Sequence, residues 1–205
     1  MEELRLIRPL EEQFEPDKCA EIRDLIAKFS ALPFEGGACR YFTLEVTGCL
    51  EAGLLLAAVS VTSVLLETFF RELLIIHRLQ SAGPKTNRWG DTRLLLNKFE
   101  KEAEDGRPRL HFDKIVDQLS GDVLDSAEAE AAKKFYRDVR VPIHHGLTRR
   151  LIAKAKAEEV DMSDPWNVFF ATYLGFRLHV LDEVIEKNAT KHLGFVVDLI
   201  QKYTK

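Results

Sequence analysis

One stretch of the chain, residues 50–79, constrains the fold more than any other. Leucine, isoleucine, valine or phenylalanine occurs at nearly every turn, and on more than one face, of the helix that this spacing predicts. A helix that is apolar on several faces has to be enclosed by neighbouring elements, because water would otherwise contact its side chains. We therefore expect a buried central helix over Leu50–Leu79 and an all-α protein.

The longest uncharged part of this stretch, Ala52–Leu66, is too short to cross a membrane. It contains Ser60, Thr62 and Ser63 and falls below the roughly 20 apolar residues that a membrane-spanning helix needs. We expect a buried core helix and no membrane association.

Shorter segments on either side also have helical spacing and helix-start residues. They predict an antiparallel helical bundle with a long central helix and extra terminal helices. Residues 39–46 fit either a short strand or the first turns of the central helix. The expected helices cover Pro16–Phe29, a segment that Asp91 caps, Phe112–Leu119, a segment from the cap Ser126 to about Arg140, Pro142 to about Glu159, Trp166 to about Asn188, and a terminal segment from Thr190.

The cysteines and the first residues suggest where the protein resides. Cys19, Cys39 and Cys49 are odd in number and form no CxxC pair, which predicts neither a disulfide framework nor a thiolate zinc site. Glu2 and Glu3 follow the initial methionine directly, where a secretory signal would carry a basic region and an apolar stretch. A reducing, cytoplasmic setting fits these features.

The motif RDVRVPIHHG, residues 137–146, groups arginines and histidines around a proline. Pro142 has no backbone N–H and disfavours helix at Val141, so we expect the chain to kink or restart there, with Pro142 in the first turn of the next helix. Such a break allows residues five positions apart to converge on one phosphate, beside a helix N-terminus that attracts anions.

The order of these features resembles the HEPN family (higher eukaryotes and prokaryotes nucleotide-binding domain), small all-α domains many of which are ribonucleases. The family signature is an arginine, four to six further residues and a histidine often followed by glycine, and Arg140, His145 and Gly146 match it. The resemblance implies a HEPN-like core over residues 41–159. Residues 1–40 would form an N-terminal extension packed on it, and residues 160–205 would form C-terminal helices of the same domain.

Two registers of the motif stay open. In the Arg140 register, Arg140 pairs with His145, but Val141 stands where the family often has a polar residue. In the Arg137 register, the partner is His144 and the polar residue Asp138 directly follows the arginine.

Helix geometry favours one register, and a glycine favours the other. On an unbroken α-helix, at about 100° per residue, the Arg137 register would align its pair within about 20°, whereas the pair of the Arg140 register would diverge by about 140°. The break at Pro142 removes this constraint, and Gly146 then favours the Arg140 register.

The resemblance implies a metal-independent endoribonuclease, of a kind found among toxins and defence effectors. The neutral imidazole of His145 would take a proton from a 2′-hydroxyl, and the guanidinium of Arg140 would stabilise charge in the transition state. This chemistry needs no metal and no cofactor. The resemblance also implies a homodimer with two motifs facing each other across a cleft, and a regulatory partner such as an antitoxin. Arg149 and Arg150, about one turn beyond His145, would extend a basic rim for the RNA backbone.

Two acidic residues have alternative interpretations. Glu67 is the single charge between Glu51 and Arg71; it either orients a catalytic side chain or, more simply, pairs with Arg71 one turn further on. Asp138 either fixes a histidine tautomer or pairs with Lys134.

The main alternative function is a non-catalytic HEPN-like module that binds a protein partner or a nucleotide. Val141 departs from the family pattern, and the chain is acidic, with a net charge of −4 and a pI near 5.9. Proteins that bind nucleic acid over a large surface usually have a clearly basic face. Both observations favour the binding module.

Overall fold

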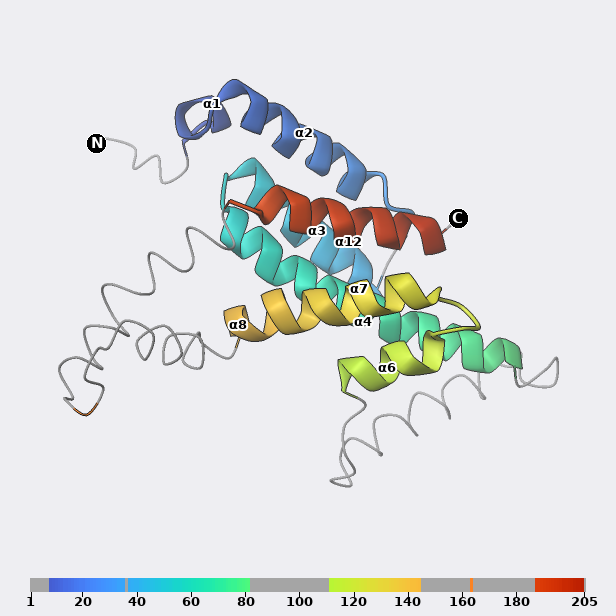
Figure 1. Cartoon of the computed structure of the whole chain (residues 1–205). Helices are drawn as coiled ribbons and strands as arrows, with labels where there is room; N and C mark the ends of the chain where they lie inside the picture. Colours follow the sequence, from blue (N-terminus) through green and yellow to red (C-terminus); the bar gives the residue numbers. More distant parts are fainter. Residues whose placement is uncertain (1–7, 36, 82–110, 145–162, 164–186, 205) are drawn as a thin grey trace. The chain divides into compact units, whose positions relative to one another are not determined.

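The computed structural model describes residues 8–35, 37–81, 111–144, 163 and 187–204. Over these residues the chain is all-α, as the sequence predicts (Figure 1). None of the helices described is long and apolar enough to cross a membrane. The chain divides into two compact units: the first comprises Met1–Leu65 and Arg137–Lys205, and the second comprises Leu66–Tyr136.

Helices α2 and α3 form an antiparallel pair in the first unit. The spacing of apolar residues correctly predicts α2, which spans Pro16–Ser30, and it is preceded by the short helix α1, Leu10–Gln13. Helix α3 spans Gly37–Glu51 and packs along α2. The side chain of Gln13, just before α2, donates a hydrogen bond of 3.4 Å to the carbonyl of Ala52, just after α3. The start of one helix therefore lies beside the end of the other.

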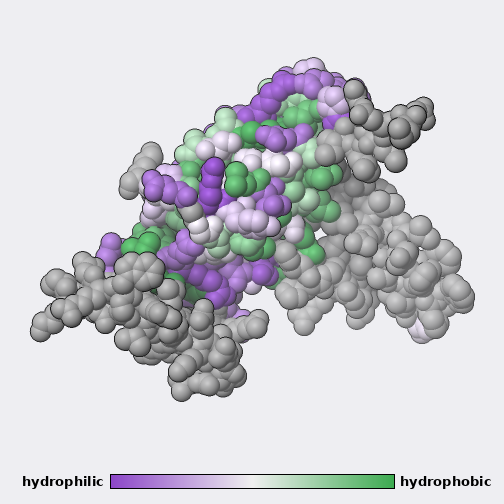
Figure 2. Space-filling model, turned by 180° about the vertical axis from the view of Figure 1, so that it is seen from behind, coloured by the Kyte–Doolittle hydropathy of each residue, from purple (hydrophilic) through white to green (hydrophobic). Residues whose placement is uncertain are grey.

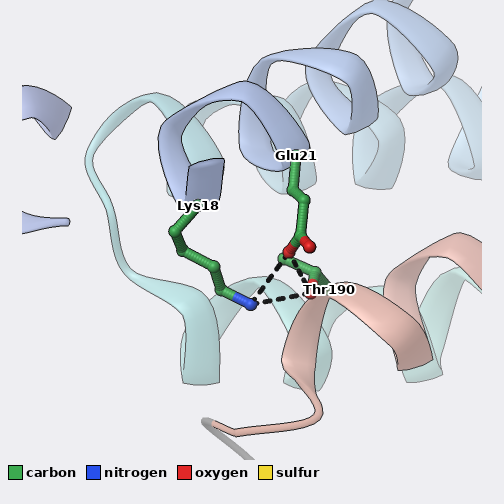
Figure 3. Close-up of polar contacts among 3 residues, drawn as sticks. All are labelled: Lys18, Glu21 and Thr190. Atoms are coloured by element: carbon green, nitrogen blue, oxygen red, sulfur yellow. Dashed lines mark hydrogen bonds and ion pairs between the residues drawn. The ribbon is translucent and has the colours of Figure 1, made fainter. Parts of the chain in front are cut away.

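The terminal helix α12, Ala189–Tyr203, runs parallel to α2 (Figure 1). Near the two N-termini, Lys18 Nζ donates to Thr190 Oγ1 at 2.8 Å (Figure 3). Near the two C-termini, Lys28 Nζ lies 3.6 Å from Asp198 Oδ1. These two contacts, ten residues apart on α2, fix the register of the pair.

A three-residue polar cluster closes the N-terminal end of this pair (Figure 3). Glu21 accepts hydrogen bonds from Lys18 Nζ at 3.1 Å and from Thr190 Oγ1 at 2.9 Å. These bonds, the one from Lys18 first, hold the pKa of the Glu21 carboxyl below its ordinary value of 4.5. The carboxylate is exposed, so the cluster orients the helices more than it stabilises them.

The core of the first unit consists of side chains three or four residues apart on each helix. The fully buried ones include Ile22 and Phe29 of α2, Val46 and Leu50 of α3, and Leu193, Val196, Val197 and Ile200 of α12.

A glycine separates α3 from the long helix α4, Leu55–Ser81. Gly53 has φ +72, and two hydrogen bonds, from Gly53 N–H to the carbonyl of Leu50 and from Leu54 N–H to the carbonyl of Cys49, form a Schellman motif. The predicted single helix over Leu50–Leu79 is therefore wrong at its start. Residues 39–46 are neither a strand nor part of the central helix, because they belong to α3.

Helix α4 itself is buried, as its sequence predicts. Side chains without access to solvent occur on successive turns and on adjacent positions. Thr62 and Ser63 are buried as well, and Ser63 Oγ donates 2.6 Å to the carbonyl of Ser60. The buried apolar residues of α4 are Leu55, Ala58, Val59, Leu65, Leu66, Phe69, Phe70 and Leu74.

The second unit contains the later part of α4 and the antiparallel helices α6, Phe112–Leu119, and α7, Ser126–Phe135. Lys133 Nζ lies 2.6 Å from Asp117 Oδ1 and connects the two helices. The bounds of α6 agree with the prediction. The cap of α7 does not, because Asp125 rather than Ser126 accepts the hydrogen bond from Glu128 N–H, at 2.8 Å.

Three aromatic rings stack in the core of this unit. The ring of Phe112 lies 5.7 Å from that of Phe70 and 4.3 Å from that of Tyr136, with interplanar angles of 15° and 3°. Phe112 is 1% exposed. The stack therefore joins α4, α6 and the residue that follows α7.

Replacing Phe112 with alanine should lower the free energy of unfolding by about 3–5 kcal/mol, because it leaves a cavity between two rings. Chemical denaturation followed by circular dichroism measures the change. Lys114→Ala, at an exposed position of the same helix, should change it by less than about 0.5 kcal/mol. A loss of under about 1 kcal/mol for Phe112→Ala would contradict the stacked core.

Replacing glycine with alanine should change the free energy of unfolding in opposite directions at two positions. Gly53→Ala should destabilise the protein by about 1–2 kcal/mol, because its φ is positive and a Cβ would meet the side chain of Gln13. Gly194→Ala, inside α12 where a Cβ meets nothing within 4 Å, should stabilise it by about 0.5–1 kcal/mol. The same denaturation assay compares the two variants. A change in the free energy of unfolding of the same sign for both would contradict the Schellman motif at Gly53.

Candidate functional site

The first half of the arginine–histidine motif lies on continuous helical backbone. Helix α7 passes directly into the π-helical segment η2, Tyr136–Arg140, and then into α8, Val141–His144. Val141 is therefore helical, contrary to the expectation for a residue before proline. The expected restart does occur, because α8 begins at Val141 with Pro142 in its first turn, but no non-helical residue separates it from η2. The predicted helix from Pro142 to about Glu159 can be followed only to His144, since residues 145–162 lie outside the described part of the chain.

The missing N–H of Pro142 explains why the helix changes type here. In an α-helix this N–H would bond to the carbonyl four residues earlier, that of Asp138. A π-helix instead pairs each carbonyl with the N–H five residues later. The wider turn over Tyr136–Arg140 thus keeps the backbone helical where one α-helical donor is absent.

Arg137 and Asp138 form an exposed pair on η2. Arg137 Nε donates to Asp138 Oδ1 at 3.3 Å, and the two side chains are 72% and 37% exposed. The expected partner of Asp138 was a histidine or Lys134, and this contact is with neither. The pair keeps a guanidinium at the surface of the segment.

Arg140 differs from Arg137 in its surroundings. It is half-buried, and its Nε atom is shielded from solvent. The preceding residue, Val139, is buried. The guanidinium of Arg137 is therefore the more exposed of the two, with its Nε on Asp138.

The π-helical turn also changes how the arginine and histidine of each register are aligned around the helix axis. A residue on a π-helix rotates less about the axis than the roughly 100° of an α-helix, so an inserted π turn shifts later positions around the axis. The alignment of positions 137 and 144 expected on a straight α-helix therefore no longer holds. His145, Gly146, and the arginines at 149 and 150 lie outside the described residues.

Glu67 forms the simpler of its two predicted contacts. Arg71 Nη2 donates to Glu67 Oε1 at 2.8 Å, one turn along α4, and the Glu67 side chain is 17% exposed. Glu67 belongs to the second unit, whereas Arg140 belongs to the first.

Side chains that bind metals do not gather in the described part of the chain. Over these residues no three or more histidine, cysteine, aspartate or glutamate side chains are grouped so that they would hold a metal ion. Cys19 and Cys39 are buried thiols and Cys49 is half-buried. The candidate site consists of the arginines and aspartate of η2 and the histidines that follow.

Comparisons with protein-family models, with curated proteins and with solved structures find no match to this chain. The resemblance to the HEPN family therefore rests on the motif and on the order of the elements.

Restoring the missing donor should stabilise the helix. Pro142→Ala should raise the free energy of unfolding by about 1–3 kcal/mol, since proline inside a helix costs about 3 kcal/mol relative to alanine. Hydrogen exchange should show a protected amide at position 142. Pro33→Ala, in an exposed loop, should instead lower stability by about 0.4–1 kcal/mol. An unprotected amide at position 142 together with lower stability would contradict this explanation of the π turn.

Proposed function

We propose that this chain is a metal-independent endoribonuclease of the HEPN type, with Arg140 and His145 as the central pair. The observation that carries the proposal is the π-helical segment η2, which holds two arginines and an aspartate directly before the two adjacent histidines. Single π-helical turns within α-helices often occur at functional sites. The motif and the unusual backbone thus coincide in one short stretch.

The reaction would be a transphosphorylation within the RNA chain. Neutral His145 takes the proton of a 2′-hydroxyl, and the 2′-oxygen attacks the adjacent phosphorus while the bond to the 5′-oxygen breaks. The departing oxygen receives a proton, and the products carry a 2′,3′-cyclic phosphate and a 5′-hydroxyl. The guanidinium of Arg140 stabilises the additional negative charge on the phosphoryl oxygens. An ordinary histidine pKa of about 6.5 leaves enough neutral imidazole for this step at cellular pH.

The other charged residues of the motif suit contact with the RNA backbone. Arg137 is exposed, and Asp138 holds its Nε, so the rest of its guanidinium can meet a phosphate. Arg149 and Arg150 would extend this basic rim. A local cluster of this kind is compatible with the acidic charge of the whole chain.

The proposal includes an assembly and a cellular role. Two copies would pair so that each contributes one Arg140–His145 motif to a shared cleft. A nuclease acting on cytoplasmic RNA has to be restrained, so a toxin or defence role with an antitoxin or another regulatory partner follows by analogy.

Cleavage of a mixed-sequence single-stranded RNA in excess EDTA tests the proposal. The wild type should produce 2′,3′-cyclic phosphate ends. His145→Ala should lose about 10²- to 10⁴-fold in rate or more, because it removes the general base. Arg140→Ala should lose activity as well, and Arg140→Lys, which keeps the charge but not the planar guanidinium, should recover only part of it.

Three further variants make the result specific. Arg8→Ala, an exposed arginine outside the motif, should keep full activity. Loss of activity in Arg137→Ala and His144→Ala, with Arg140→Ala and His145→Ala active, would assign the site to the Arg137 register. Circular dichroism of every variant separates loss of catalysis from loss of folding.

One observation favours the alternative, a non-catalytic HEPN-like module. The solvent-shielded Nε of Arg140 suits an arginine that packs at a helix junction as well as one that binds phosphate. If folded wild-type protein cleaves none of a diverse set of RNAs, the binding module is the better account. Arg140→Ala would then lower the free energy of unfolding, as expected for an arginine that packs at a helix junction.

A further inference from the structure

Helix α3 has an uncharged face that points into solvent. Gly37, Tyr41, Leu44 and Gly48 follow one another at spacings of four, three and four residues, so they form one line along the helix. The side chains of Tyr41 and Leu44 are 58% and 52% exposed. A Cβ added at either glycine would meet nothing within 4 Å.

The opposite face of the same helix is already packed. Cys39, Thr43, Val46 and Leu50, with the same spacing, are buried. Helix α3 therefore has two uncharged faces, and only one of them is used within the described part of the chain. Exposed helix faces normally carry charged residues, so an uncharged exposed line is unusual. Figure 2 shows the surface seen from behind, where green apolar residues lie among purple polar ones.

The exposed line has the pattern of a short helix-pairing seam. In a heptad, Tyr41 and Gly48 occupy a positions, and Gly37 and Leu44 occupy d positions. The a and d positions form the contact between two paired helices. Glycine at an a position removes the side chain and lets the two backbones approach closely.

The charged residues beside this line would attract each other between two copies of α3 only if the two helices run parallel. Arg40 occupies a g position and Glu45 the e position five residues later. In two parallel helices, g and the following e of the partner lie side by side, so Arg40 of each copy meets Glu45 of the other. In an antiparallel pair, e positions face each other and the two copies of Glu45 would repel.

Neither residue has another described role. Arg40 is half-buried and Glu45 is exposed, and the ion pairs among the described residues include neither of them. Within one helix the two positions lie about 140° apart, so they do not pair with each other. A partner from another chain is the arrangement that uses both.

We propose that α3 pairs in parallel with α3 of a second copy of this chain, about a two-fold axis along the helices. The interface is isologous, with Tyr41 and Leu44 on the axis and two reciprocal pairs of Arg40 with Glu45 at its edges. A helix of 15 residues is about 22 Å long, so the contact lies at the small end of specific interfaces. The α3 contact would join the two copies that the proposed function requires, and the pairing itself does not depend on nuclease activity.

Sedimentation equilibrium of the full chain, from low micromolar to several hundred micromolar, tests the pairing. The wild type should dimerise reversibly. Arg40→Glu and Glu45→Arg should each weaken association about tenfold or more, because each replaces two attractions with two repulsions. An equimolar mixture of these two variants should dimerise again, since one chain is then acidic at both positions and the other is basic at both.

The mixing result distinguishes this interface from any other. Structural damage within one chain cannot be repaired by a second damaged chain, so recovery on mixing supports the parallel pairing. The double variant Arg40→Glu with Glu45→Arg should dimerise by itself, and Lys114→Glu, an exposed charge reversal on α6, should leave association unchanged. A monomeric wild type, a dimer unaffected by Arg40→Glu, or no recovery on mixing would overturn the proposal.

Discussion

The burial of α4 is the constraint on which the rest of the described structure depends. Its apolar side chains occupy several faces, so neighbouring helices have to cover it. In the second unit this cover includes the aromatic stack of Phe70, Phe112 and Tyr136. Tyr136 is also the first residue of η2.

One missing hydrogen-bond donor accounts for the local backbone of the candidate site. Pro142 cannot bond to the carbonyl of Asp138, and the backbone remains helical by forming a π turn over the two arginines. That turn sets Arg137 at the surface and leaves Arg140 half-buried. Pro142, where a kink or restart was expected, thus lies directly after the point at which the helix changes type.

Sequence reasoning succeeded where one local rule acted alone. Apolar spacing predicted α2, the bounds of α6 and the burial of α4, and the i, i+4 rule predicted the contact of Glu67 with Arg71. It failed where two rules competed. The apolar pattern concealed the Schellman motif at Gly53, although the glycine was a visible signal, and two adjacent residues were both suited to cap α7. The contact of Arg137 with Asp138 joins neighbours that do not face each other on an α-helix, so helix periodicity could not predict it.

The central claim is that the motif after α7 performs transphosphorylation from a 2′-hydroxyl. The most direct measurement compares the cleavage of two strands of the same sequence, one of ordinary RNA and one with 2′-O-methyl groups at every position. Both reactions are run in excess EDTA under single-turnover conditions. The account predicts that the RNA is cleaved to 2′,3′-cyclic phosphate ends and that the methylated strand remains intact, because it has no nucleophile. Equal cleavage of both strands in EDTA, or cleavage of the RNA only in a parallel reaction that contains Mg²⁺ and no EDTA, would contradict it.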